Sequence, residues 1–210
     1  MRLPLVLLLL LMPTCAYATQ VLSMDLSAMV SQADVVIRAR VVRTEPVAVT
    51  TDGVIVGAAD AMGGGRGRLR YETRVDLDVI EDLMVDSAAP AVPARKASFH
   101  LSGGRIGRFA QVVAGTPGVV VGDEIVVILE RSAASPILRV VGFSQGLWHT
   151  ADLIGLEPLA RSDRSGAELL PGESGVIAPI VDVRPLEALL GELRRVIAAS
   201  KAAAPKGRGQ

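Results

Sequence analysis

Two segments of the chain alternate apolar and polar residues, which predicts half-buried antiparallel strands. In segment 34–42 the apolar positions share one face: Val35, Ile37, Ala39 and Val41. In segment 71–79 the expected inward positions are Tyr71, Thr73, Val75, Leu77 and Val79. The charged residues between them are expected to face water: Glu72, Arg74, Asp76 and Asp78. A period of two is typical of a sheet with one face on the core and the other in solvent.

Three more short strands are predicted at residues 97–101, 124–129 and 137–143. Residues 125–129 are apolar on both faces, which predicts a central strand covered on two sides. The Asp52-Gly53 pair predicts the turn of an additional hairpin between residues 47–50 and 54–56. Short strands separated by Gly and Pro turns favour a small barrel or a sandwich. The glycine-rich residues 63–68 are expected to form a flexible, exposed tip.

Helical spacing is found near both ends of the strand region. Residues 23–32 predict a short helix with Ser23 as its N-cap. A longer amphipathic helix is predicted to start at Pro185, with an apolar stripe made by Leu186, Leu189, Leu190, Leu193, Val196 and Ile197. We expect this stripe to pack on the barrel, and the alternative is an interface with a partner. Residues 161–175 are polar and predicted to be irregular.

The first residues resemble a secretory signal peptide. Arg2 precedes an apolar run over residues 3–12, Pro13 breaks that run, and Ala16-Tyr17-Ala18 offers small residues for cleavage after Ala18. Acylation at Cys15 and a retained signal anchor are the alternatives. The predicted organisation is a signal peptide (1–18), a barrel domain (19–150), an irregular segment with the C-terminal helix packed on the barrel (151–200), and a disordered tail (201–210). Export to the periplasm or the extracellular space follows, with no stable membrane span after cleavage.

Composition excludes several classes of function. The 210 residues contain 22 basic and 22 acidic residues, so a strongly basic nucleic-acid groove is not expected. Only 3% of the residues are aromatic, which leaves little for base stacking. Cleavage after Ala18 removes Cys15, the one cysteine, and with it any disulfide, thiol nucleophile or cysteine metal site.

The catalytic candidates are few. Residues 142–146 read Gly-Phe-Ser-Gln-Gly, a G-x-S-x-G match centred on Ser144. His149 is the only imidazole after Ser144, and no acidic residue lies between them, so a glycine-flanked strand end explains the match better. The other imidazole, His100, is expected to point to solvent from its strand. Two histidines without metal-binding spacing do not predict a zinc site.

Two charged segments have a structural and a functional interpretation. Residues 103–108 read Gly-Gly-Arg-Ile-Gly-Arg, which could cradle an anion but is more often a wide turn. The second segment is acidic and could suggest a calcium site, but it lacks the spacing of a calcium-binding loop. A solvated strand face is the better interpretation of its residues, which are Asp76, Asp78, Glu81 and Asp82. We predict no catalytic, cofactor-binding or metal-binding residue.

Several stretches resemble strands of known barrel domains: Ser31–Val42 (SQADVVIRARVV), Tyr71–Val75, Val79–Leu83 and Gly122–Leu129 (GDEIVVIL). They are similar to the netrin-like domains, which include tissue inhibitors of metalloproteinases, and to a group of uncharacterised secreted bacterial proteins. The resemblance covers about residues 22–148 and implies an OB-like five-stranded antiparallel barrel with a helix or two alongside. The protease inhibitors of that class bind zinc through an N-terminal Cys. Thr19 is the expected mature N-terminus here, so the resemblance implies the scaffold without that mechanism.

The sequence therefore predicts a mainly β, OB-like fold in an exported, non-enzymatic binding module. Its ligand is not predicted; an exported protein such as a protease is a candidate partner. The alternatives are a secreted hydrolase that uses Ser144 and His149, and an envelope structural protein that assembles through the C-terminal helix.

Overall fold

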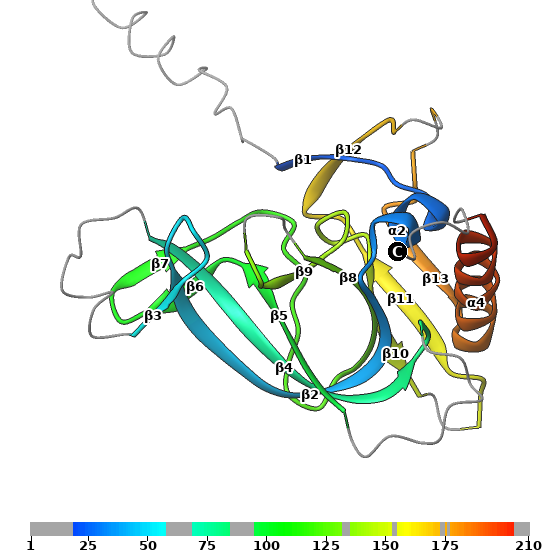
Figure 1. Ribbon diagram of the computed structural model, residues 1–210, viewed down its shortest axis with the longest axis horizontal. Helices are drawn as coiled ribbons and strands as arrows, with labels where there is room; N and C mark the ends of the chain where they lie inside the picture. Colours follow the sequence, from blue (N-terminus) through cyan, green and yellow to red (C-terminus); the bar gives the residue numbers. More distant parts are fainter. Residues whose placement is uncertain are drawn as a thin grey trace, which may run out of the picture.

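Five strands close into an OB-like barrel (Figure 1): β2 (Val35–Val49), β4 (Arg70–Asp82), β5 (Lys96–Ser102), β8 (Glu124–Arg131) and β9 (Leu138–Val140). The order around the barrel is β2-β4-β5-β9-β8, and β8 pairs again with β2. All neighbours are antiparallel except β5 and β9, which run parallel. This computed structural model describes residues 19–57, 69–84, 95–131, 135–152, 155–172, 175 and 177–203. The predicted fold class is confirmed, including the short N-terminal helix and the C-terminal helix.

The long strand β2 bends to take part in two pairings. Register shifts between Arg38 and Ala39, and between Val41 and Arg43, mark bulges that increase the local twist. Its first half pairs with both β4 and β8, and its second half continues along β4. The inward alternation predicted for both strands is confirmed by the barrel core, which contains Ile37, Ala39, Val41, Val75, Leu77, Phe99, Leu101, Ile125, Val127, Leu129, Val140 and Leu147.

Strand β8 is covered on both faces, as its sequence predicts. Ile125, Val127 and Leu129 point into the barrel, whereas Val126 and Ile128 lie in a second apolar cluster under the helices. Those helices are α2 (Leu26–Gln32) and α4 (Leu186–Ala203), and they lie together on one side of the barrel (Figure 1). The molecule therefore has two apolar layers that share β8.

Both helix starts differ from the sequence prediction. Helix α2 is capped by Asp25, whose Oδ1 accepts a hydrogen bond from the Ala28 N–H at 2.7 Å. Ser23 is buried instead, and its Oγ accepts from the Ala178 N–H. Helix α4 begins at Leu186, because Pro185 is the last residue of a strand.

The apolar stripe of α4 packs inward, as predicted. Leu186, Leu189, Leu190, Leu193 and Ile197 are all buried in the cluster that contains Val126, Trp148 and Ala160. Residues 201–203 belong to the helix, so the predicted tail is wrong there, and the rest of that prediction lies outside the described residues. Neither of the described helices combines the length and the apolar character that crossing a membrane requires.

Beyond β8, the sheet continues as three strands that leave the barrel: β10 (Leu147–Ala151), β11 (Leu159–Asp163) and β13 (Val181–Pro185). We call these three strands the sheet wing. A separate pair of parallel strands joins β1 (Thr19–Leu22) to β12 (Ala167–Leu170). The prediction of an irregular segment at residues 161–175 is therefore wrong at 161–163 and 167–170, which belong to β11 and β12. Its alternation was hidden because two inward positions, Ser162 and Arg164, are polar and yet buried.

Two hairpins lie at the opposite end of the barrel from the helices (Figure 1). The first joins β2 to β3 (Ile55–Val56) around Asp52-Gly53, as predicted, with Gly53 at φ +85°. The second joins β6 (Gly104–Ile106) to β7 (Phe109–Gln111), so residues 103–108 form a hairpin and not a wide turn. Strand β9 ends at Val140, shorter than predicted, because residues 141–146 form a turn with Phe143 at φ +68°. The predicted tip at residues 63–68 lies outside the described residues.

Candidate binding site

The sheet wing has one covered face and one open face. Trp148 and Ala160 point to the side of α4, where they join the buried cluster. Because side chains alternate along a strand, the neighbouring residues lie on the other face. The register places His149 opposite Arg161, and Arg161 opposite Val183. We call this second side the open face; its residues are His149, Leu159, Arg161, Asp163, Val181 and Val183, and the buried Leu147 joins it to the barrel core.

A pocket of about 460 Å³ lies on the open face, next to the barrel. One wall is the loop of residues 115–118, and the floor is formed by β10 and β11. Its polar lining comes from five side chains: Thr116, His149, Arg161, Asp163 and Ser165. A concave site with a few convergent polar groups is the usual form of a binding site.

Two glycines allow the walls of this pocket to meet. A Cβ atom on Gly166 would lie 2.6 Å from Gly115 Cα, closer than real Cβ atoms approach. Gly115 also has φ +78°, a conformation that favours glycine. The pocket is therefore shaped by backbone contact between the loop and the turn that follows β11.

The ionisable groups of the pocket are held by short contacts. His149 Nδ1 lies 3.4 Å from Asp123 Oδ2, and the same oxygen accepts a hydrogen bond from the Val120 N–H at 2.9 Å. Arg161 donates to Asp163 at 2.9 Å. Hydrogen bonds from the Ser165 hydroxyl and N–H, aided by Arg161, hold the pKa of Asp163 below its usual value. The pocket thus brings together the side chains of His149, Arg161 and Asp163, and Asp163 is a carboxylate at neutral pH.

Ser144 is not part of this pocket. It is 2% exposed, in the turn between β9 and β10, and does not line the cavity where His149 lies. The G-x-S-x-G match is explained by the turn itself, in which a Cβ on Gly146 would come within 2.8 Å of the Val141 carbonyl oxygen. The geometry gives no reason to join Ser144 to His149 as nucleophile and base.

Gln145, beside Ser144, has a role that sequence reasoning missed. Its side chain is fully buried, and its Oε1 accepts from the Met24 N–H at 2.9 Å. Its Nε2 donates to the carbonyl oxygens of Leu22 at 2.8 Å and Gly142 at 3.2 Å. This amide therefore joins the N-terminal segment to the β9–β10 turn.

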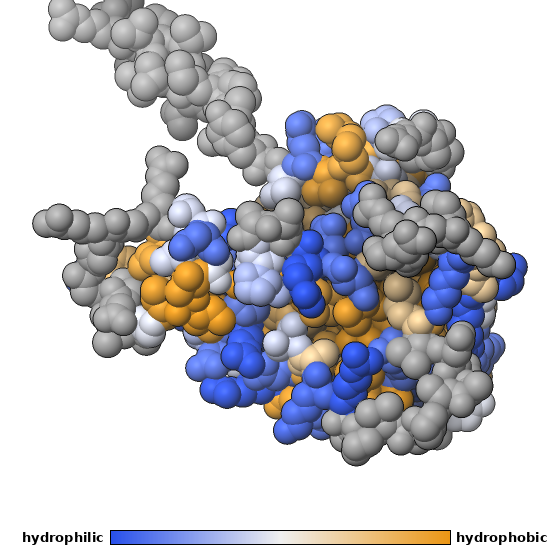
Figure 2. Space-filling view, viewed as in Figure 1, coloured by the Kyte–Doolittle hydropathy of each residue, from blue (hydrophilic) through white to orange (hydrophobic). Residues whose placement is uncertain are grey.

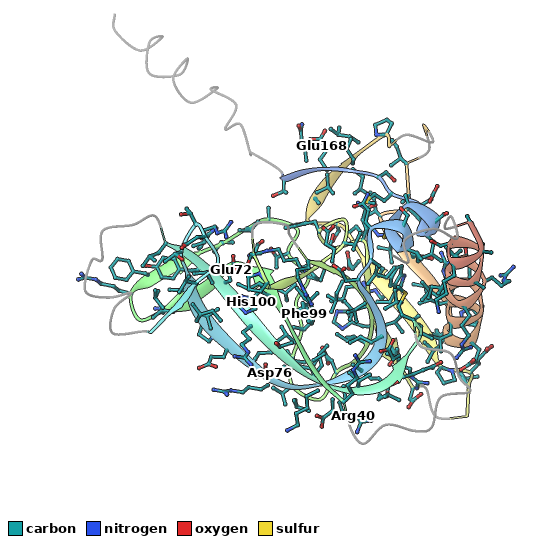
Figure 3. The ribbon with its side chains drawn as sticks, in the orientation of Figure 1. Arg40, Glu72, Asp76, Phe99, His100 and Glu168 are labelled. Atoms are coloured by element: carbon teal, nitrogen blue, oxygen red, sulfur yellow. The ribbon has the colours of Figure 1, made fainter. Side chains whose placement is uncertain are left out.

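The predictions for His100 and Glu72 are wrong, because both are buried. His100 is 5% and Glu72 is 2% exposed, and His100 Nδ1 lies 3.0 Å from Glu72 Oε2. Arg139 donates to the other carboxylate oxygen at 2.7 Å. Figure 3 places Glu72 and His100 next to each other, with Phe99 toward the barrel interior. Residues 136–138 and Ile55 of β3 lie with His100 around one cavity, so they cover a strand face that alternation alone assigns to solvent.

Electrostatics at Glu72 favour its charged form. Burial alone raises the pKa of Glu72, but the hydrogen bonds and the charges of His100 and Arg139 outweigh burial and lower it. A carboxylate with these partners stays ionised at neutral pH. Glu72 therefore acts as the buried counter-charge of this cluster.

The remaining charged candidates are engaged in local contacts. Three acidic residues pair with arginines: Asp76 with Arg74, Glu81 with Arg194 and Asp82 with Arg95. In the described part of the chain, no group of three or more His, Cys, Asp or Glu residues could hold a metal. Arg105 donates to the Gly107 carbonyl, and Arg108 lies over the Phe109 ring. Asp76, Glu81 and Asp82 thus take part in ion pairs, and both arginines of residues 103–108 make contacts within their own hairpin.

Comparison with protein-family models, with curated proteins and with solved structures finds no match for this chain. The netrin-like resemblance stays a prediction. Function is therefore argued from geometry alone.

Proposed function

We propose that this protein is an exported, non-enzymatic binding module whose open face binds an extended segment of a partner polypeptide. One observation carries the proposal: β13 is an edge strand whose free main-chain groups lie beside exposed valines and a polar pocket. Export is supported by the signal-like residues 1–18.

The free edge of β13 follows from its hydrogen-bond pattern. The Arg164 N–H donates to Ile180 O and the Leu186 N–H donates to Pro158 O, which fixes the alternation of the ladder. In an antiparallel pair, residues between the hydrogen-bonded positions turn their N–H and C=O groups outward. Val181 and Val183 occupy those positions, and β13 has no second strand neighbour among the described residues. An added strand would find two residues with donors and acceptors free.

The side chains beside this edge suit a peptide. Val181 is 43% and Val183 is 53% exposed, and Arg161 lies directly across from Val183. Main-chain hydrogen bonds give affinity in strand addition, and contacts to alternate side chains give specificity. Pro185 lacks an N–H, which limits the free edge to a short length and reduces uncontrolled sheet growth.

The alternative functions use groups that this geometry places elsewhere. Ser144 is buried outside the His149 pocket, so no observation favours a hydrolase. The apolar stripe of α4 is packed on the wing and is not available as an assembly surface. An exported protease remains a candidate source of the bound segment.

The proposal predicts that Val183→Glu weakens peptide binding at least about tenfold, since a carboxylate replaces an apolar contact beside the free edge. Peptides would be selected from a random library on the immobilised protein, and the affinity of purified peptides would be measured by fluorescence polarisation. Val183 is half exposed, so the variant is expected to unfold at nearly the same temperature.

Ile80→Glu is the matched control, because Ile80 is 49% exposed on β4, outside the open face. We expect it to bind the selected peptides as the unmodified protein does. A library that yields no peptide above background contradicts the proposal. So do peptides that bind the Val183→Glu protein with unchanged affinity.

A further inference from the structure

We propose that a second cavity, on the outer side of the barrel, binds a small organic anion. The cavity has a volume of about 320 Å³ and lies over β4 and β5, against residues 136–138 and Ile55 of β3. Its polar side chains are Arg74, Ser98, His100 and Arg131, and we call it the basic pocket. It shares no lining residue with the pocket of the open face and is independent of the proposed function.

Charge is the first argument. Three of the polar lining residues are basic, and none of the lining residues is acidic. The Arg131 N–H donates to Asp34, but its guanidinium has no acidic partner in the described part of the chain. Arg74 uses its Nε on Asp76 at 2.7 Å, which leaves its terminal nitrogens free for a ligand. Guanidinium groups present a planar set of donors that matches carboxylate and phosphate oxygens.

Positioning is the second argument. His100 lines the pocket and is more than nine-tenths buried, so its ring is held in place. A carboxylate only accepts hydrogen bonds, so the contact with Glu72 requires the proton on His100 Nδ1. With its proton on Nδ1, the imidazole presents a lone pair at Nε2, so the donors that this pocket offers an anion are those of Arg74 and Arg131. Arg139 holds the second oxygen of Glu72 and thereby fixes the carboxylate behind the imidazole.

The shape of the pocket decides the ligand class. The other four lining residues are apolar, namely Ile55, Pro136, Ile137 and Leu138, and Leu138 pairs with Arg131 across the β8–β9 ladder. A bare inorganic ion would leave those apolar residues in contact with water. A carboxylate or a phosphate monoester on a compact apolar body would meet the guanidinium groups and the apolar residues together.

The test is isothermal titration of the purified protein with four probes: benzoate, phenyl phosphate, inorganic phosphate and the neutral benzamide. We expect one-to-one binding of benzoate or phenyl phosphate, with benzamide and inorganic phosphate each at least about tenfold weaker. The two organic anions show whether the carboxylate or the phosphate is preferred.

Arg131→Ala is the decisive variant, because it removes one exposed guanidinium and leaves the Glu72 cluster intact. This variant should bind the preferred anion at least about tenfold more weakly, since a hydrogen bond between charged groups is lost. Arg195→Ala removes an exposed arginine of α4 whose one hydrogen bond within the described part of the chain is to the Gly191 carbonyl, and it should leave anion binding unchanged.

Three results would overturn the proposal: no heat from either organic anion up to about 10 mM, equal binding of benzamide, or unchanged binding by the Arg131→Ala protein. If inorganic phosphate bound as tightly as phenyl phosphate, the apolar body would add nothing to binding, and the proposed class of organic ligands would be wrong. Because Val183→Glu lies outside the basic pocket, it should leave anion binding unchanged, which separates this test from that of the open face.

Discussion

Glu72→Ala is expected to lower the free energy of unfolding by about 3 kcal/mol, because it leaves the Arg139 guanidinium and the His100 Nδ1–H without their buried acceptor. His100 is almost fully buried, and Arg139 is three-quarters buried, so water replaces little of what they lose. Urea unfolding at about pH 7 measures the change. Glu45→Ala is the control, since Glu45 pairs with Arg43 at the surface and should cost less than about 0.5 kcal/mol.

The effect of Glu72 should also depend on pH in a defined direction. Its folded pKa is lowered below the ordinary value of 4.5, so its stabilisation is fully present above that value. It is lost as the pH falls through the lowered folded pKa, where the carboxylate takes up a proton. The stability difference between the unmodified protein and Glu72→Gln should therefore shrink on acidification. A difference that stays constant down to about pH 3 would contradict this account of the cluster.

Gln145→Ala is expected to lower the free energy of unfolding by about 3 kcal/mol, close to the effect of Glu72→Ala. The substitution removes the three hydrogen bonds of a fully buried amide and leaves the half-buried Met24 N–H and the Leu22 and Gly142 carbonyl oxygens without that partner. Thermal unfolding measures the loss, and faster amide exchange at Met24 locates it. Gln145→Met keeps most of the volume, so a loss of about 2 kcal/mol in that variant would come from the hydrogen bonds.

Gln20→Ala is the control for Gln145, because Gln20 donates only to the exposed Glu168. We expect this variant to unfold as the unmodified protein does. If Gln145→Ala were as stable as Gln20→Ala, the N-terminal segment would not depend on the amide contact.

The barrel could be predicted from sequence because its strands carry a clear period of two. Val75 and Leu77 on β4 alternate with charged residues, and the doubly apolar β8 is buried on both sides. The helix stripe of α4 was equally clear, since its leucines recur at helical spacing. In these elements the local pattern and the tertiary packing agree.

Prediction was wrong where polar residues are buried by distant segments. His100 and Glu72 occupy positions that alternation assigns to water, but the β2–β3 hairpin and residues 136–138 fold over that face. Strand β11 was missed for a related reason, because Ser162 within it and Arg164 just after it are polar and yet buried. No local signal encodes such coverage, since it depends on contacts between residues far apart in sequence.

The two proposed binding sites differ in the residues that they expose. Figure 2 shows hydrophilic residues along the lower rim of this face, over β2 and β4, and hydrophobic residues near the hairpins at the left end. The open face of the wing combines exposed valines with a polar pocket, whereas the basic pocket is lined by two arginines, a histidine and apolar residues. The two surfaces therefore suit different partners, a polypeptide and a small anion.

Residue-resolved amide exchange with a bound peptide tests the central claim most directly. Strand addition at β13 should slow exchange at Val181 and Val183, whose N–H groups have no acceptor among the residues that the structure describes. Asp182 and Arg184 already donate to β11 and should change less, which gives an alternating pattern along the strand. If a saturating peptide left exchange at Val181 and Val183 unchanged, the edge of the wing would not be the binding surface.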